Sequence, residues 1–176
     1  FGNDRDPHRR LRVGFVSPDF RAHSVSFFLR PLLDNLDGSG IEAHAYADVA
    51  HPDGITARLR QSVSQWHDIW RKPEEAVLAQ IRADGIDVLV DLAGHTADNR
   101  LTLFARRAAP VQATYLGYPA TTGLPAMDAR IVDRRSDPDG AEAHASERLC
   151  RLDRCFLAYA PDSYPEIAPP PALVIG

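Results

Sequence analysis

Residues 86–92, with the sequence IDVLVDL, constrain the fold more than any other part of this chain. They form an apolar run of β-branched residues and leucines, interrupted only by acids, which is typical of a strand buried on both faces of a parallel sheet. The run is followed by Gly94, His95 and Thr96, and then by an apolar-periodic segment at residues 101–106. Strand, polar loop and helix make half of a βαβ unit, and open α/β sheets bind ligands at the carboxyl ends of their strands. The loop that carries His95 and Thr96 is therefore predicted to lie at the mouth of a site.

The rest of the chain repeats this alternation of strands and helices. Apolar residues spaced as on one helical face predict a helix over residues 25–36, with Pro31 near its first turn or at a kink. Pro73 suits the first position of a later helix. The alternation predicts an α/β fold with a Rossmann-like, doubly wound parallel sheet. The expected strands are 11–17, 41–47, 66–70, 86–92, 111–116, 129–132, 147–152 and 155–159, and the expected helices are 25–36, 56–65, 73–83 and 99–107.

Composition excludes several classes of protein. With 176 residues, of which 44% are hydrophobic and 25% charged, the chain suits one α/β domain with a sizeable core. No apolar stretch approaches the length of a membrane span, and a net charge of −4 argues against a nucleic-acid surface. Cys150 and Cys155, on a segment expected to be partly buried, favour free thiols in a reduced cytoplasmic protein. Two cysteines do not make a zinc site without further cysteines or a converging histidine.

Changes in composition along the chain predict three segments. Residues 1–10 are polar and are interpreted as a linker leading into the domain, and residues 11–161 form the Rossmann-like domain. Residues 162–176 are interpreted as an irregular, proline-rich tail. Its last residues, 172–176, are interpreted as a cut end or a segment brought in from elsewhere in the chain.

Three polar loops directly follow predicted strands, at residues 18–24, 94–99 and 117–123. In a parallel sheet all three loops lie along one edge, so their side chains are expected to converge. His23 and His95 are candidates for a general base, because imidazole titrates near neutral pH. The alternative for each histidine is a helix cap or a hydrogen bond to loop backbone.

Other polar residues of these loops also have two interpretations. Asp19 is a candidate to orient a histidine, or to accept hydrogen bonds from the backbone of its own loop. Thr96 and the pair Thr121 and Thr122 suit contacts with ligand hydroxyls, and they suit helix caps equally well. The convergence of the loops predicts a site without naming its chemistry.

Several sharper motifs are missing or weak. The sequence lacks both main glycine-rich phosphate-binding loops and the G-x-S-x-G elbow of serine hydrolases. Asp91 at a strand end lacks the later lysine expected of a phosphorylated receiver domain. The D-x-D pairs at residues 4–6 and 137–139, a form used by metal-dependent sugar transferases, are interpreted as solvated loops. No metal site is predicted.

At these same loops the sequence resembles a known family. The ordered blocks are similar to the catalytic region of O-linked N-acetylglucosamine transferases (glycosyltransferase family 41), which includes SPINDLY-type protein O-fucosyltransferases. The resemblance covers residues 11–161, and the blocks are specific as an ordered set rather than singly. They are RVGFVSPDF at 12–20 with His23 and Ser26 behind it, GHTADNRL at 94–101, APVQATYLGYP at 109–119, TTGLP at 121–125 with Asp128, and SERL at 146–149.

The resemblance implies an inverting, metal-independent transferase of two Rossmann-like domains, the GT-B arrangement, of which this chain is the N-terminal catalytic half. The implied reaction moves N-acetylglucosamine from UDP-GlcNAc to Ser or Thr hydroxyls of a protein or peptide acceptor. It implies a C-terminal half that binds most of the nucleotide sugar, tetratricopeptide repeats upstream, and no cofactor, metal, membrane or nucleic acid. The alternatives are an O-fucosyltransferase that uses GDP-fucose, and a non-catalytic α/β module that binds peptides or nucleotides.

The resemblance also implies roles for individual residues. His23 matches the active-site histidine of the family's first loop, as the base or as a contact to acceptor and sugar, with proton removal by the donor phosphate as the alternative. The implied substrate-binding residues come from all three loops. They are Asp19, His95, Thr96, Gly117, Tyr118 and Pro119.

Overall fold

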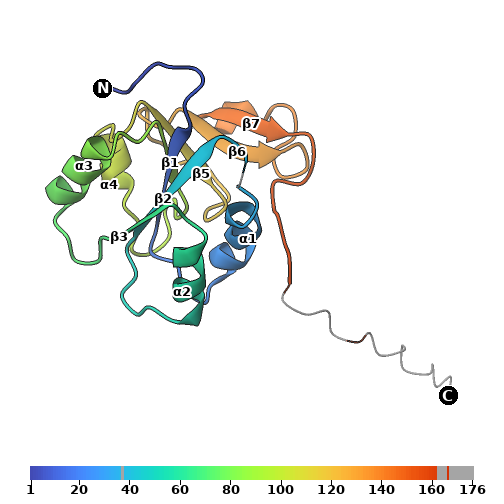
Figure 1. The fold of residues 1–176 in the computed structure, drawn as a ribbon. Helices are drawn as coiled ribbons and strands as arrows, with labels where there is room; N and C mark the ends of the chain where they lie inside the picture. The colour runs from blue at the N-terminus through green and yellow to red at the C-terminus, as the bar shows by residue number, and fades with distance from the viewer. Residues whose placement is uncertain (37, 162–165, 167–176) are drawn as a thin grey trace.

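The computed structural model describes residues 1–36, 38–161 and 166, which build one seven-stranded sheet (Figure 1). All neighbouring strands are parallel, in the order β3-β2-β1-β4-β5-β6-β7. This order confirms the predicted doubly wound parallel α/β fold. The strands are β1 (Leu11–Ser17), β2 (Ile41–Ala47), β3 (Gln65–Asp68), β4 (Val88–Asp91), β5 (Val111–Tyr115), β6 (Ala129–Asp133) and β7 (Arg148–Leu152).

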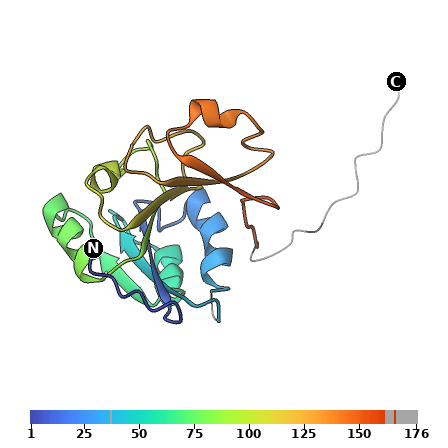
Figure 2. The same cartoon turned by 90° about the horizontal axis from the view of Figure 1, so that it is seen from above.

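Helices cover both faces of this sheet. α1 (Ser24–Leu33) and α2 (Gly54–Gln61) bury apolar residues against one face, and α3 (Glu74–Ala83) and α4 (Leu101–Ala105) against the other. Figures 1 and 2 both show α1 and α3 on opposite sides of the strands. A short 3-10 helix, η1 (Ala141–His144), precedes β7. None of the helices in the described part of the chain is long and apolar enough to cross a bilayer.

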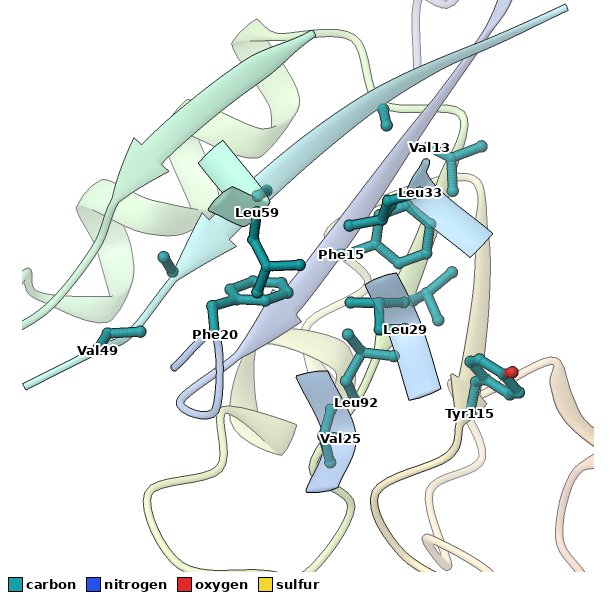
Figure 3. Packing of buried hydrophobic residues seen from close by; sticks show 14 residues of the cluster. Val13, Phe15, Phe20, Val25, Leu29, Leu33, Val49, Leu59, Leu92 and Tyr115 are labelled. Atoms are coloured by element: carbon teal, nitrogen blue, oxygen red, sulfur yellow. The ribbon is translucent and has the colours of Figure 1, made fainter. Parts of the chain in front are cut away.

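The two core layers explain why the central strand must be apolar on both sides. Phe15 packs with Leu29 of α1 in the layer beneath α1 and α2 (Figure 3), whereas Val16 faces the layer beneath α3 and α4. Leu29 is fully buried, and burying such a side chain contributes about 1.5–3 kcal/mol. A charged side chain at residues 13, 15 or 16 of β1 would therefore lie in one of the two cores.

Two prolines lie at helix positions other than those predicted. Pro31 is in the last turn of α1 rather than near its first, and the Asn35 side chain donates to the Pro31 carbonyl (2.8 Å) as the chain leaves the helix. The helix ends at Leu33, short of the predicted residue 36. The Asn35 side chain, rather than its backbone N–H, bonds the Pro31 carbonyl, and the Asn35 N–H bonds the Leu32 carbonyl instead. Pro73 precedes α3 as its N-cap with extended backbone (φ −57°, ψ 143°), one position before the predicted one.

The other differences fall near the ends of elements. Residues 155–159 form no strand, because the backbone of Phe156 bonds to the side chains of Asp133 and Tyr115 instead of to β7. Both cysteines are free and exposed, so the expectation of a partly buried segment was wrong. α4 is shorter than predicted, since Arg107 just beyond it adopts a left-handed backbone (φ 54°). The tail interpreted at residues 172–176 lies outside the described residues.

Asp87 anchors the first ten residues to the amino edge of the sheet. Its carboxylate accepts hydrogen bonds from the Arg9 guanidinium (2.6 and 2.7 Å), the Asn3 amide (2.7 Å) and the Arg12 N–H (2.9 Å). Burial by itself raises the pKa of Asp87, but the bonds from Arg9, Arg12 and Asn3 outweigh it and hold the pKa at about 2. The charged form of Asp87 therefore stabilises the junction of β1 and β4.

Replacing Asp87 by Asn should lower the free energy of unfolding by about 2 kcal/mol at pH 7, because the pKa of the folded carboxyl lies well below its ordinary value of 3.8. This contribution is present above pH 3.8 and is lost as the pH falls through about 2. Urea unfolding of the two proteins should thus differ at neutral pH and converge near pH 2. In an Asp153→Asn control, which removes an exposed carboxylate, the change should stay within about 0.5 kcal/mol at both pH values. An Asp87→Asn deficit that is the same at pH 7 and pH 2 would contradict this account.

Candidate active site

A cleft of about 680 Å³ opens at the carboxyl edge of the sheet, where the strand order reverses between β1 and β4. Ligands of doubly wound folds bind at this topological switch point, because the loops that follow the two central strands turn away to opposite sides there. The loops after β1, β2 and β4 supply most of the lining, and Trp70 after β3 completes it. The lining residues are Pro18, Asp19, Arg21, Ala22, His23, Asp48, Ala50, His51, Asp53, Trp70, Thr96, Ala97 and Asp98.

His23 ends the β1 loop as the N-cap of α1. Its Nδ1 accepts a hydrogen bond from the Val25 N–H (3.3 Å), so the neutral ring with this bond carries its proton on Nε2. Asp19 Oδ2 lies 3.6 Å from the same Nδ1, and it can accept a hydrogen bond from Nδ1–H when the ring is in the other tautomer or charged. The helix-cap and Asp19-oriented interpretations of His23 therefore compete for one ring nitrogen.

Two buried serines fix the backbone of the loop that carries Asp19 and His23. The Asp19 N–H donates to Ser17 Oγ (2.9 Å), and the Asp19 carbonyl accepts from Ser26 Oγ (2.5 Å), with both serines fully buried. Arg21 pairs with the Asp19 carboxylate at 3.2 Å. These contacts hold the backbone of Asp19 in place and leave its carboxylate facing both Arg21 and His23.

Two polar contacts join the loops around the cleft. Asp53 caps α2, and its Oδ2 also accepts from the Ala22 N–H (2.7 Å), so it ties the β2 loop to the β1 loop. Hydrogen bonds from the backbone N–H groups of Thr56 and Ala22 lower the pKa of Asp53. Arg100, after β4, pairs with buried Asp48, after β2, at 2.6 Å. The cleft is thus bounded by loops that are bonded to one another.

His51 is a cleft residue that was not among the predicted site residues. This exposed histidine lines the cleft together with His23, but it lies on the loop after β2, which was interpreted only as a turn. The signal was present, because residues 41–47 were themselves predicted as a parallel strand, and the loop that follows must reach the same edge.

A second group of predicted residues lies beside the cleft. The His95 and Tyr118 rings meet edge to face, with centroids 5.4 Å apart. His95 Nε2 lies 2.8 Å from the Thr122 carbonyl, which can only accept, so Nε2 carries the proton and Nδ1 holds the lone pair. Thr96, the next residue, lines the cleft and donates from Oγ1 to the Ala93 carbonyl (2.8 Å).

Two glycines allow the loops after β4 and β5 to touch. A Cβ added at Gly94 would fall well inside 3.0 Å of Tyr118 Cβ, and one at Gly117 would overlap the Leu92 carbonyl oxygen. Gly94 also has a left-handed backbone (φ 54°), which glycine adopts without strain. The contact between Tyr118 and His95 therefore requires glycine, which has no side chain, at both positions.

Glu147, just before β7, clamps the β5 loop. Its carboxylate accepts from the Thr122 N–H (2.6 Å) and from the hydroxyls of Thr121 and Thr122. Burial raises the pKa of Glu147, but the bonds from Thr122 and Thr121 outweigh it, so the pKa is lowered and the buried carboxyl stays charged. Since Thr122 is the partner of His95, Glu147 indirectly fixes that imidazole.

The acids weighed as alternative motifs have structural partners. Asp91 is almost fully buried and accepts from the N–H groups of Ala93 and Gly94 and from Thr114 Oγ1, and burial raises its pKa. Asp137 is buried and paired with Arg130 rather than solvated, which corrects the interpretation of its D-x-D pair as a solvated loop.

The predicted site residues therefore form two adjacent groups with one outlier. Asp19, His23 and Thr96 line the cleft, and His95 and Tyr118 pack beside it with Gly117 at the loop contact. Pro119 lies outside both groups: it is exposed, and its carbonyl accepts from Arg130 Nη1 at 3.3 Å.

A larger cavity, of about 1030 Å³, lies at the opposite, amino edge of the sheet. It is lined by residues of the first ten positions together with Arg12, Glu42 and Arg82, and by none of the predicted site residues. Because it is remote from the carboxyl ends of the strands, we regard the smaller cleft as the candidate active site.

Comparison with known families decides the affiliation of the chain. The sequence model of Glycosyl transferase family 41 matches residues 1–162. The chain belongs to this family. The matched range includes every loop that lines the cleft.

Relatives of this family 41 chain agree with that assignment. It is 42% identical over 99% of its length to a "Probable UDP-N-acetylglucosamine--peptide N-acetylglucosaminyltransferase SPINDLY" of Arabidopsis thaliana, and covers 20% of that protein. A protein of the same plant with the corresponding name SEC is 30% identical over 85% of the chain and 15% of the relative. The chain thus spans about a fifth of the length of the curated relatives it matches.

A solved structure supports the fold of this family 41 domain. An O-GlcNAc transferase mutant of Thermobaculum terrenum superposes with a TM-score of 0.89 at 42% identity. The match covers 93% of this chain and 32% of the other. The Rossmann-like sheet is therefore one part of a larger chain in that neighbour.

Replacing Gly117 by Ala should separate the β4 and β5 loops, because the new Cβ meets backbone that cannot rotate away. We expect a loss of at least about 2 kcal/mol in the free energy of unfolding, measured by urea denaturation, and loss of the Tyr118–His95 ring contact in NMR chemical shifts. A matched control is Gly54→Ala, at a helical position where no atom lies within 4 Å of the added Cβ. That variant should be neutral or slightly more stable. Equal stability of both variants would show that the loops are not in contact.

Proposed function

We propose that this chain is the N-terminal catalytic half of a protein O-GlcNAc transferase, which moves N-acetylglucosamine from UDP-GlcNAc to Ser or Thr hydroxyls with inversion and without a metal. One observation carries the proposal: in a family 41 domain, the cleft at the switch point is lined by His23, Asp19 and Thr96. The printed names of the relatives, as UDP-N-acetylglucosamine–peptide transferases, support the donor and the acceptor class. Inversion and metal independence rest on the family resemblance of the sequence blocks.

In this reaction an acceptor hydroxyl oxygen bonds to the anomeric carbon of the sugar as the bond from that carbon to the diphosphate oxygen breaks. The electron pair of the broken bond leaves with UDP, and the hydroxyl proton must pass to a base. General base catalysis of this kind contributes about 10²–10⁴-fold. The chain offers His23 for this step, with His51 as a second imidazole on the same cleft.

The tautomer of His23 determines which role it can take. With Nδ1 bonded to the Val25 N–H, Nε2–H is a donor, suited to hold an acceptor or sugar oxygen. If instead Nδ1–H donates to Asp19, Nε2 becomes a base, and Asp19 stabilises the imidazolium that forms. Proton removal by the donor phosphate is the alternative under which His23 acts only as a donor.

The described residues suit the acceptor side of such a reaction better than the donor side. The sequence has no glycine-rich phosphate loop, and negative charge leaving as diphosphate needs cations or helix N-termini. We therefore assign most of the UDP-GlcNAc contacts to a C-terminal Rossmann-like domain in a GT-B arrangement. A cytoplasmic location and tetratricopeptide repeats upstream, which would present protein acceptors, belong to the same proposal.

Replacing His23 by Ala in the full-length protein should lower kcat by about 10²–10⁴-fold, as expected for loss of the proton acceptor. The measurement is UDP release from UDP-GlcNAc in the presence of a Ser/Thr peptide, with circular dichroism as the test of folding. His8→Ala, an exposed histidine at the amino edge, serves as the matched control and should leave turnover unchanged. Unchanged turnover in folded His23→Ala would remove this residue from the mechanism.

Donor choice is tested by giving the full-length protein UDP-GlcNAc and GDP-fucose separately with the same peptide. We expect nucleotide release from UDP-GlcNAc to exceed release from GDP-fucose by at least about tenfold. The reverse preference would identify an O-fucosyltransferase. Binding of peptide or nucleotide with no release from either donor, and no effect of His23→Ala, would identify a non-catalytic module.

A further inference from the structure

A cluster of metal-ligand side chains lies away from the cleft, between the sheet and the end of α3. His44 comes from β2, His67 from the neighbouring β3, and Asp84 directly follows α3. One ligand atom of each residue lies within 4.8 Å of the other two, and it is the one such group found among the described residues. None of the three residues lines the candidate active site.

The register of the sheet creates this cluster. His44 and Tyr46 lie on the same face of β2, and Tyr46 pairs with His67 across the ladder. The His67 ring stacks on Tyr46 (centroids 4.8 Å apart) and on His44 (5.8 Å apart). The two imidazoles are therefore held side by side by backbone pairing and stacking.

Ring nitrogens of both histidines are buried without a hydrogen-bond partner. His44 is only 4% exposed, and its Nδ1 has no hydrogen-bond partner. His67 Nε2 is likewise buried without a hydrogen-bond partner. A buried polar atom without a partner destabilises the fold, and a bound ion would supply that partner. The His44 Nε2 lies 3.0 Å from Glu42 Oε1, so Glu42 holds the proton on Nε2 and leaves a lone pair on Nδ1. A carboxylate behind an imidazole is the usual support of a histidine metal ligand.

The charges of the cluster also suit a cation. Asp84 Oδ2 lies 3.4 Å from His67 Nε2 and accepts from the Tyr46 hydroxyl (2.7 Å), while Oδ1 accepts from Gln80 (2.8 Å). This carboxylate stands at the C-terminal end of α3, where the helix dipole is negative and favours a positive charge.

We propose that His44, His67 and Asp84 form a binding site for a divalent transition-metal ion of the Zn²⁺ class. Two imidazole nitrogens and one carboxylate oxygen are the ligands such ions take when a fourth position is left to water. The side chains of His67 and Asp84 are 19% and 17% exposed, so the cluster lies close to the protein surface although its ring nitrogens are buried. Small side-chain rotations bring the three atoms to the separations of about 3.4 Å that tetrahedral bonds of about 2.0–2.1 Å require.

The bound ion would join β2, β3 and the end of α3, so its effect is on stability rather than on sugar transfer. The protein supplies three ligands and leaves a fourth position to water, so we expect the site to fill at metal concentrations above those of closed structural zinc sites.

The test is a titration of the full-length protein with Co²⁺ after treatment with a chelator. Co²⁺ in a tetrahedral nitrogen and oxygen site gives visible absorption bands, so the readout does not depend on enzyme activity. We expect these bands in the wild type, and we expect Zn²⁺ to abolish them by displacement and to raise the Tm as its concentration increases. The variants His67→Gln and Asp84→Asn should each weaken Co²⁺ binding by at least about tenfold, whereas the exposed His8→Gln control should bind as the wild type does.

Asp84→Asn keeps the shape of the side chain and so separates metal ligation from folding. Absence of the bands in the folded wild type would overturn the proposal, as would equal Co²⁺ affinity in the wild type and both site variants. Bands that respond to His8→Gln but not to His67→Gln would place the metal elsewhere and would overturn it equally.

Discussion

The parallel pairing of β1 with β2 on one side and β4 on the other is the constraint on which the rest of the molecule depends. It sends the loops after these three strands to one edge, and it makes the strand order reverse there. The loops that line the cleft are far apart in sequence, and the parallel strand pairing brings them together. The same ladder leaves β1 with an apolar core on each face, which explains why residues 13–16 carry no polar side chain.

Much of this arrangement could be predicted, because buried parallel strands carry a strong local signal. The strands at residues 11–17 and 41–47 match their predicted limits, and the order follows from alternation with helices. Local signals failed where tertiary contacts decide the conformation. Residues 155–159 look like a strand, yet side chains of Asp133 and Tyr115 take up the backbone of Phe156. Pro31 lies in the last turn of α1, where the Asn35 side chain donates to its carbonyl as the chain leaves the helix.

The candidate site was predictable in its position more than in its contacts. That His23, Thr96 and Tyr118 would share one edge follows from topology, as the structure bears out. That Glu147 would fix the partner of His95 could not be read from sequence, because the residues are far apart in the chain and an acid before a strand has no distinguishing pattern. The position of His51 follows from the same topology, because β2 is parallel to β1 and the loop after it reaches the same edge.

Asp53 has a consequence for how the cleft responds to occupancy. One carboxylate oxygen starts α2 by accepting from the N–H groups of Ile55 and Thr56, and the other holds Ala22, the neighbour of His23. The conformation of the loop that carries His23 and the first turn of α2 are therefore linked through a single acid. A substrate that displaced His23 and Ala22 would also disturb the first turn of α2. A substrate that left His23 in place would contact a loop whose position α2 already fixes.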